Sequence, residues 1–220
     1  MVLKLYGISR AAGHTLAVAM TLIEKQVPFE LISIDTANRA QKEPAYLAIQ
    51  PFGQVPVIDD DGFVLYECRA ICRYLAEKYA EQGTPLIPTD LKAKALFEQA
   101  ASIEFANFHP HAFAIYTEGL AKPRKGLQTD KAAFDASVAQ LSAKLDVYEQ
   151  ILGKHEYLAG DEFTLADLFH VSFGFLIAAA GCDLLTTKGP NVARWWNAVS
   201  TRPSVARFKD DITLRGIESY

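Results

Sequence analysis

The stretch QPFGQVPVIDDDGFVLYECRAICRYLAEKY, residues 50–79, decides the fold. Two short runs rich in apolar residues lie within 55–67, and Asp61-Gly62, a pair typical of a tight hairpin turn, joins them. The next run, 68–80, changes to helical spacing, with apolar side chains that recur three and four residues apart. We therefore predict an antiparallel hairpin followed directly by a helix.

Upstream of this stretch, strand-like and helical patterns alternate. VLKLY (2–6) and FELISID (29–35) have the composition and alternation of strands, and TLAVAMTLIEK (15–25) between them has helical spacing. A crossover helix normally joins parallel neighbours, so these two strands are expected to be parallel. Together with the antiparallel hairpin they predict a four-stranded mixed sheet, an α/β domain of thioredoxin-like shape over residues 1–80.

Downstream, the periodic pattern breaks at EQGTPLIPTDLKAK (81–94), which contains one glycine and two prolines and is predicted to be a linker. Almost every pattern after it is helical, so residues 95–220 are expected to form an all-α domain. Within this domain, Thr164 and Asp167 have the spacing of a capping box that begins a helix. The stretch NVARWWNAVSTRP predicts a later helix that ends before Pro203.

The composition excludes several classes of function. The 220 residues carry a net charge of −4, so nothing favours nucleic acid or an anionic membrane surface as a partner. The longest apolar run, 169–182, is too short to span a bilayer and contains His170. The first residues do not resemble a secretory signal, and the three cysteines show no metal-ligand clustering. We expect a cytoplasmic protein with reduced thiols and no metal.

Two features of the deciding stretch indicate a ligand site. Pro56 in QVP indicates a fixed turn with a cis bond after Val55, which would leave the Val55 backbone free to pair with an extended peptide. Glu67 and Cys68 begin a helix, where backbone N–H groups favour an anion and Glu67 can pair with an ammonium group. A small zwitterionic peptide fits both. The alternative is that Glu67 caps its own helix and Pro56 only ends a loop.

The same motifs carry a family resemblance. QPFGQVP and ECRAI resemble NPFGQVP and ESRAI, a hallmark of the phi-type glutathione transferases of plants, with similar sequences in fungi. The resemblance covers essentially the whole chain, including AQKEPAYL and YLAGDEFTLADL. It implies a thioredoxin-like domain that binds glutathione and a helical domain with a pocket for a hydrophobic co-substrate. It also implies a cytoplasmic homodimer with a role in detoxification.

The resemblance also implies which residues bind glutathione, its substrate. They match the family's glutathione contacts position by position: Gln41, Lys42, Gln54, Val55, Pro56, Glu67 and Cys68. Two of them depart from the family pattern. Gln41 stands where many members have histidine, and Cys68 replaces a serine whose hydroxyl and N–H both bind the γ-glutamyl carboxylate. The lost hydroxyl would weaken glutathione binding by roughly 1.5–3 kcal/mol if nothing replaces its hydrogen bond.

A third departure concerns the turn GISRAAGHT, residues 7–15. The family serine that stabilises the glutathione thiolate falls on Ala11, or on Ala12 or Gly13 in another register, so its hydroxyl is missing. Ser9 is the nearest replacement, and a backbone N–H at the helix start is an alternative donor. Arg10 and His14 are further candidates, although we expect His14 to be exposed at the helix start, with Thr15 as an N-cap or first-turn residue.

The aromatic run IEFANFHPHAFAIY, residues 103–116, is the candidate for the hydrophobic pocket. We expect Phe108, Phe113 and Tyr116 to line it, although a helix of this kind also buries a stripe of its residues. The leading hypothesis is a glutathione transferase that joins the glutathione thiolate to hydrophobic electrophiles, with activity weakened by the missing serine. The alternative is a non-catalytic protein of the same fold that binds small hydrophobic molecules or other ligands.

Overall fold

The computed structural model describes residues 2–8 and 13–206. The chain divides into two compact units, one up to Pro85 and one over Leu86–Arg202, and residues 203–206 return to the first unit. The expected linker, 81–94, contains this division. Its last four residues are already helical, because Asp90 accepts hydrogen bonds from the N–H groups of Lys92 and Ala93 and so begins a helix at Leu91.

The first unit is built on a four-stranded mixed sheet, as the sequence predicts. Its strands are β1 (Leu3–Gly7), β2 (Phe29–Ser33), β3 (Val57–Asp60) and β4 (Phe63–Tyr66), in the order β2-β1-β3-β4. β1 pairs in parallel with β2, whereas β3 is antiparallel to both β1 and β4. Asp61 and Gly62 both have positive φ, which is the backbone conformation that this hairpin turn requires.

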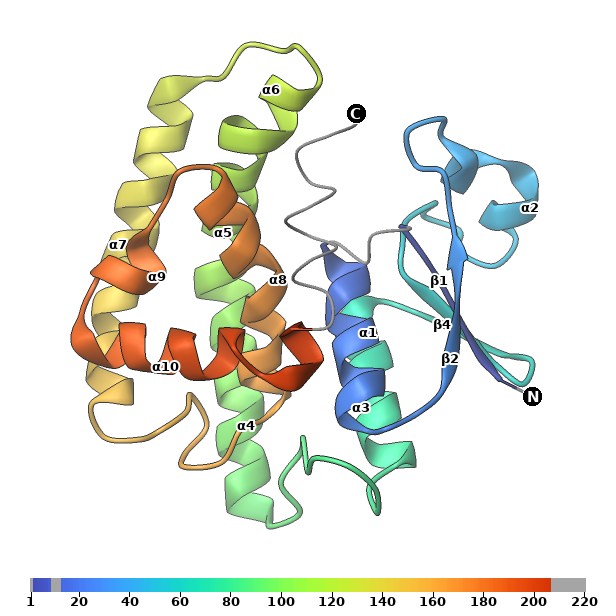
Figure 1. The fold of residues 1–220 in the computed structure, drawn as a ribbon, viewed down its shortest axis with the longest axis horizontal. Helices are drawn as coiled ribbons and strands as arrows, with labels where there is room; N and C mark the ends of the chain where they lie inside the picture. The colour runs from blue at the N-terminus through green and yellow to red at the C-terminus, as the bar shows by residue number, and fades with distance from the viewer. Residues whose placement is uncertain (1, 9–12, 207–220) are drawn as a thin grey trace. The chain divides into compact units, whose positions relative to one another are not determined.

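Two long helices bury their apolar faces in this unit. α1 (His14–Glu24) and α3 (Cys68–Lys78) lie side by side against the sheet (Figure 1). Leu16 and Met20 of α1, Ile71 and Leu75 of α3, and Leu5 of β1 are all fully buried. Between β2 and β3 the chain forms a short 3-10 turn, η1 (Ala40–Lys42), and the four-residue helix α2 (Pro44–Leu47).

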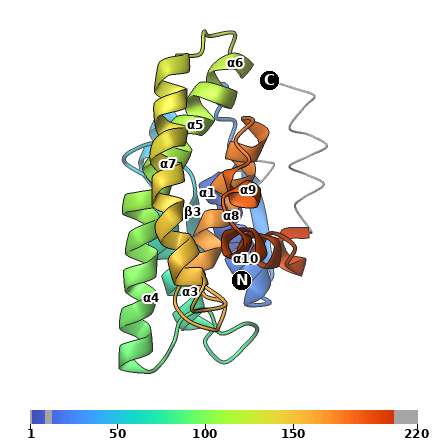
Figure 2. The ribbon, with the colours of Figure 1, turned by 90° about the vertical axis from the view of Figure 1, so that its left-hand side faces the viewer.

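The second unit is helical throughout. Its principal helices are α4 (Leu91–Ile103), α5 (His109–Tyr116), α7 (Lys131–Leu152), α8 (Leu165–Ala179) and α10 (Pro190–Ser200). Two short helices complete it, α6 (Lys122–Arg124) and α9 (Leu184–Thr187). α5 packs against both α7 and α8 (Figure 2). The apolar run 169–182 therefore falls largely in α8, a helix of the core, where Phe169, Val171 and Phe173 are buried.

Two segments of π-helix interrupt the chain between α4 and α6. They are η2 (Glu104–Phe108) and η3 (Thr117–Ala121), and each is followed by a helix with proline as its second residue, Pro110 or Pro123. Proline has no N–H with which to continue the ordinary i→i−4 pattern, and its ring crowds the carbonyl four residues earlier. A wider turn just before each proline accommodates both effects.

The buried carboxylate of Asp167 organises the centre of the helical unit. Its Oδ1 accepts hydrogen bonds from the Leu158 N–H at 3.0 Å and from the Trp195 indole N–H at 2.9 Å. Its Oδ2 accepts from the N–H and hydroxyl of Thr164, which completes the predicted capping box of α8. Burial raises the pKa of this carboxyl, and the four hydrogen bonds oppose that rise.

A buried histidine lies next to this carboxylate centre. His170 is fully buried, and its Nδ1 lies 2.8 Å from the Ala166 carbonyl, which can only accept, so Nδ1 donates to it. Its Nε2 lies 3.0 Å from the Tyr148 hydroxyl and shares a hydrogen bond with it. Both rings also contact Trp195 edge-on. Polar groups at this depth are paired, as buried polar groups must be for a stable core.

No helix in the described ranges, 2–8 and 13–206, is both long and apolar enough to cross a membrane.

Replacing Asp167 by Ala is expected to destabilise the protein severely, because it leaves three N–H donors and one hydroxyl in the core without their acceptor. We expect the free energy of unfolding to fall by about 3 kcal/mol or more, measured by urea denaturation. Asp135→Ala is the matched control, since Asp135 forms an exposed ion pair with Lys131 on α7 that should contribute about 0.5 kcal/mol. Equal losses in the two variants would contradict the role assigned to Asp167.

Candidate functional site

Because β3 pairs with both β1 and β4, the segments that carry the candidate site residues come together at one end of the sheet. Val57 lies opposite Tyr6 of β1 and opposite Tyr66 of β4, so these three residues form a row across the sheet. β1 ends at Gly7, one residue after Tyr6, β3 begins at Val57, and α3 begins two residues after Tyr66. The end of β1, the start of β3 and the start of α3 therefore lie close together.

The turn before β3 presents an open backbone. The Val55–Pro56 peptide bond is cis, as predicted from QVP. Tyr46 of α2 donates from its hydroxyl to the Gln54 carbonyl at 2.8 Å, and burial raises the pKa of Tyr46 to about 12, so it remains a donor. Throughout the described ranges, no other group is hydrogen-bonded to the N–H or C=O of Val55. That pair is available to an extended peptide.

Glu67 occupies a strained backbone position at the start of α3. Its φ is +72°, in the region that favours glycine, and its exposed side chain makes no capping hydrogen bond to the helix. A non-glycine residue held there costs of order 1–3 kcal/mol and is characteristic of ligand sites. The absence of a side-chain cap argues against the simpler alternative, in which Glu67 only caps its own helix. The start of α3, where the helix dipole favours an anion, is thus not capped by the Glu67 side chain.

Cys68 connects the start of α3 to the start of α1. Its Sγ lies 3.3 Å from the His14 carbonyl and donates to it, and the residue is 7% exposed. Cys72, one turn later, is fully buried, and neither cysteine forms a disulfide. The two thiols are packing residues, as expected from their spacing on one helix face. The Cys68 thiol is therefore directed into the protein, towards the start of α1.

His14 differs from the expectation of an exposed histidine. It is only partly exposed and its Nε2 is buried, which lowers its pKa to about 4; the positive charge of Arg69 contributes to the same shift. The imidazole is therefore neutral at physiological pH. The prediction failed because α3 packs over the first turn of α1, a tertiary contact that the local sequence pattern does not report.

Thr15 lies in the first turn of α1, which is one of the two predicted positions, whereas Gly13 is the N-cap. Thr15 is buried, at 1% exposed. A Cβ on Gly7 would come within 2.2 Å of the Thr15 Cγ2. β1 must therefore end in glycine for the Thr15 side chain to pack against it. The Thr15 hydroxyl therefore cannot reach a ligand on the surface. Ser9 lies outside the described residues, as do Arg10, Ala11 and Ala12.

Gln41 and Lys42 are held next to the PFG turn. Lys42 donates from Nζ to the Phe52 carbonyl at 2.8 Å. Gly53 has a φ of +59°, and a Cβ there would meet the Gln41 carbonyl and the Lys42 side chain at 2.7 Å each. This glycine is required for the approach of Lys42, a role that the sequence analysis missed along with that of Tyr46. The Gln41 Oε1 is buried and, within residues 2–8 and 13–206, has no hydrogen-bond partner.

The three predicted pocket residues of the helical unit differ in exposure. Phe108 is fully buried and packs against His170, with ring centroids 4.6 Å apart, so it belongs to the core of the isolated chain. Phe113 is 48% exposed and Tyr116 partly exposed, and both rings contact Phe173. In the part of the chain that the structure describes, no group of three or more His, Cys, Asp or Glu side chains could hold a metal ion.

Comparisons with known proteins match most of the chain. Family models described as the glutathione S-transferase N-terminal and C-terminal domains match residues 14–78 and 105–203. The chain is 43% identical to glutathione S-transferase hmp2 of Hypomyces subiculosus, over 92% of this chain and 95% of that one.

Solved structures also match nearly the whole chain. Glutathione transferase F7 from Populus trichocarpa superposes with a TM-score of 0.92 at 33% identity, covering 96% of this chain and all of the other. Glutathione S-transferase I from maize, in complex with an atrazine glutathione conjugate, gives 0.87 at 32% identity, with 96% and 98% covered.

The buried state of His14 predicts a pH dependence of stability. Since its pKa falls to about 4 on folding from 6.5, the unfolded chain takes up a proton between these values that the native state does not. The contribution of His14 to stability should therefore decline as the pH falls from 6.5 towards 4. Urea denaturation of the parent and of His14→Gln at pH 7, 5.5 and 4.5 should show their difference in unfolding free energy shrinking; a constant difference would contradict the burial argument.

Proposed function

This chain belongs to the glutathione transferase family and is similar to its plant phi class, and we propose that it joins the glutathione thiolate to hydrophobic electrophiles. The observation that supports this most is the open backbone of Val55 next to the strained start of α3 at Glu67. The relatives favour a transferase over the non-catalytic ligand-binding alternative.

Glutathione itself would use the backbone groups described above. The cysteinyl part would pair with the N–H and C=O of Val55, in the manner of an added strand, with Gln54 and Pro56 on either side. The γ-glutamyl carboxylate would accept from the Cys68 N–H at the N-terminus of α3, where the helix dipole favours negative charge. Glu67, at the same place, would receive the γ-glutamyl ammonium group.

The glycyl carboxylate of glutathione would lie against Lys42 and Gln41. Lys42 is exposed and already fixed by its bond to the Phe52 carbonyl, so little side-chain entropy is lost when it meets an anion. Gln41 can donate one hydrogen bond from its amide but carries no charge. Binding at this end should therefore depend mainly on Lys42.

Activation of the sulfur is assigned to the turn between β1 and α1. A cysteine thiol with a pKa of about 8.5 is mostly protonated at pH 7, so a donor that stabilises the thiolate increases the reactive fraction. Ser9 is the side chain we assign to this role, with a backbone N–H at the start of α1 as the alternative. Neutral His14 carries no positive charge to attract the thiolate. The thiolate then forms a bond to the electrophilic carbon, the leaving group departs, and the thiol proton passes to solvent.

The hydrophobic co-substrate is assigned to the helical unit. Phe113 and Tyr116 offer exposed aromatic surface, and Phe173 beneath them restricts their rings. Phe108 would act only as support from the core unless it becomes exposed on binding. Rigid aromatic surface suits planar apolar electrophiles, such as the parent of the conjugate that the maize relative binds.

We further propose that the protein is a cytoplasmic homodimer that acts in detoxification. The first unit exposes Phe52 at 64%, Phe63 at 50% and Val64 at 38%, on the turn before β3 and on the edge strand β4. Large apolar side chains exposed together on a sheet edge are a liability unless another surface covers them. A second copy of the chain is the partner that the family relationship favours.

The transferase assignment is tested by conjugation kinetics with 1-chloro-2,4-dinitrobenzene and glutathione between pH 6 and 9. We expect saturable enzymatic conjugation above the uncatalysed rate. Ser9→Ala should lower kcat by about 100-fold or more if the hydroxyl is the donor, and leave it unchanged if a backbone N–H serves. Ser137→Ala is the control, because Ser137 is a partly exposed residue of α7 whose hydroxyl donates to the Ala133 carbonyl of the same helix. A protein that binds glutathione but conjugates no electrophile would overturn the proposal.

The role of Gly53 provides a sharper test of the Lys42 contact. Gly53→Ala and Gly62→Ala both place a side chain at positive φ, so each should cost about 1–2 kcal/mol of stability. Only the first forces the new Cβ against Lys42, since nothing lies within 4 Å of the second. Calorimetry with S-hexylglutathione should show weaker binding for Gly53→Ala alone. Equal affinity in the two variants would show that Lys42 does not contact the ligand.

Cys68→Ser should strengthen glutathione binding. A hydroxyl is a much better hydrogen-bond donor than a thiol, and one added bond to a carboxylate corresponds to about tenfold in Kd. Cys72→Ser is the matched control, because it makes the same change one turn later in the buried core and should leave the affinity unchanged. Unchanged binding in Cys68→Ser would show that the side chain keeps its contact with the His14 carbonyl instead of reaching the ligand.

A further inference from the structure

The chain passes between the two units at two places, and both places are built in the same way. The helical unit runs without interruption from Leu86 to Arg202, so its peptide connections to the first unit are Pro85–Leu86 and Arg202–Pro203. Both connections contain a proline, whose ring fixes φ at about −65° and so removes one rotatable backbone bond. Each connection is therefore short and stiff.

The carboxylate of Glu24, the last residue of α1, holds both connections on the side of the first unit. Its Oε2 accepts from the Thr84 hydroxyl and its Oε1 from the Ser204 hydroxyl, at 2.5 Å each. Glu24 is 8% exposed and Ser204 is 2% exposed, so water competes little for these hydrogen bonds. One buried side chain thus binds the residue before the first proline and the residue after the second.

The first connection is also bound to the end of α1 through its backbone. The Thr84 N–H donates to the Glu24 carbonyl at 2.9 Å, and the buried Lys25 donates from Nζ to the Thr84 carbonyl at 3.0 Å. Gly83 has a φ of +63°, and a Cβ there would overlap the Glu24 carbonyl oxygen. Gly83 is therefore required for the chain to approach α1 this closely.

On the side of the helical unit, both connections are fixed to residues at the start of α8. The Leu86 carbonyl accepts from the Leu165 N–H at 3.0 Å. The Arg202 guanidinium lies 3.8 Å from the centroid of the Phe163 ring, two residues before α8 begins. Each proline thus lies between two fixed residues, one in each unit.

We infer that Glu24 is a positioning residue for the transfer reaction, because its carboxylate fixes both connections to the unit that is assigned the electrophile. This rests on the proposed function, in which glutathione belongs to the first unit and the hydrophobic co-substrate to the helical one. The sulfur and the electrophilic carbon must be held about 3–3.5 Å apart, and a displacement of about 1 Å can cost about 100-fold in rate. Glu24 is buried, so it acts through the two connections and not by contact with a substrate.

The test compares Glu24→Ala with the parent protein in the conjugation of glutathione to 1-chloro-2,4-dinitrobenzene. We expect kcat/KM for the electrophile to fall by about tenfold or more, with a higher KM for the electrophile, while the Kd of glutathione measured by calorimetry stays within about twofold. A purely structural loss would lower kcat and the number of glutathione sites in the same proportion, and would leave KM unchanged.

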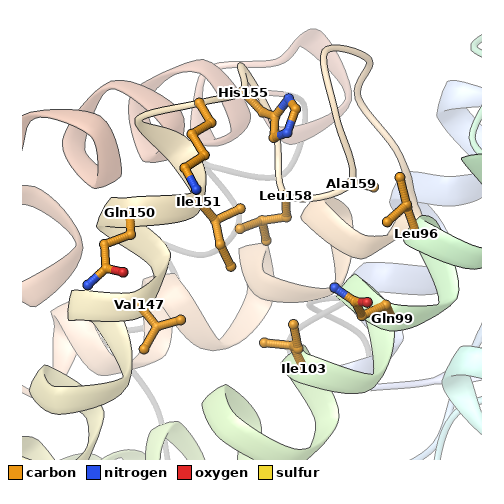
Figure 3. A pocket seen from close by; sticks show the side chains of 10 residues that line it. Leu96, Gln99, Ile103, Val147, Gln150, Ile151, His155, Leu158 and Ala159 are labelled. Carbon is orange, nitrogen blue, oxygen red and sulfur yellow. The ribbon is translucent and has the colours of Figure 1, made fainter.

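Glu149→Ala is the matched control. Glu149 is a partly buried carboxylate of α7 that accepts from the N–H groups of Asn191 and Val192, so it also joins two segments, but both belong to the helical unit. The next residue, Gln150, lines a pocket whose residues all belong to this unit (Figure 3). We expect Glu149→Ala to lose stability and to keep the parent's KM for the electrophile.

A milder variant keeps the test valid if Glu24→Ala does not fold. Ser204→Ala removes one of the two hydroxyl donors and should raise KM for the electrophile by about threefold. Ser200→Ala, at the end of α10, should leave it unchanged. The inference is overturned if the Glu24 and Ser204 variants keep the parent's KM, or if Glu149→Ala raises KM as much as Glu24→Ala does.

Hydrogen exchange at the N–H groups of Thr84 and Leu165 reports on the two anchored ends without any need for activity. Exchange of both should be about tenfold faster in Glu24→Ala than in the parent, and unchanged in Glu149→Ala. Unchanged exchange in Glu24→Ala would overturn the anchoring role. If the parent protein conjugates no electrophile, the proposed function fails and the positioning role fails with it, whereas faster exchange would still show that Glu24 anchors the connections.

Discussion

The candidate site depends on the position of β3 between β1 and β4. Because Val57 pairs with Tyr6 on one side and Tyr66 on the other, the end of β1, the start of β3 and the start of α3 come together at one end of the sheet. The Cys68–His14 contact fixes the first turns of α3 and α1 against each other, and Tyr46 fixes the Gln54 carbonyl before the cis bond. The open backbone of Val55 and the N-terminus of α3 therefore lie at the same end of the sheet.

Much of this arrangement could be predicted from the sequence because it depends on local signals. The hairpin at Asp61-Gly62, the cis bond after Val55 and the capping box at Thr164 each arise from residues within four positions of one another. The surroundings of His14 and Phe108 could not, since their burial comes from helices that are distant in sequence. The role of Gly53 was hidden for a similar reason, because it is defined by the space that Lys42 occupies.

In the helical unit, one buried carboxylate has two consequences. Asp167 caps α8 and binds Trp195, which stabilises the core, and it also accepts from the Leu158 N–H, which holds the loop after α7. Burial of this carboxyl raises its pKa, and its four hydrogen bonds oppose part of that rise. The start of α8, the Trp195 contact and the loop after α7 therefore depend on one side chain, while the motifs QPFGQVP and ECRAI lie on the other unit.

We propose that the turn at residues 7–15 activates the glutathione sulfur without the serine of the family pattern. A pH titration of the thiolate ultraviolet absorbance of glutathione at saturating protein measures this activation. We expect the bound thiol to ionise at least one pH unit below the free value of about 8.5. A bound thiol that titrates like free glutathione would contradict it, and would leave the protein with a glutathione site that does not activate its ligand.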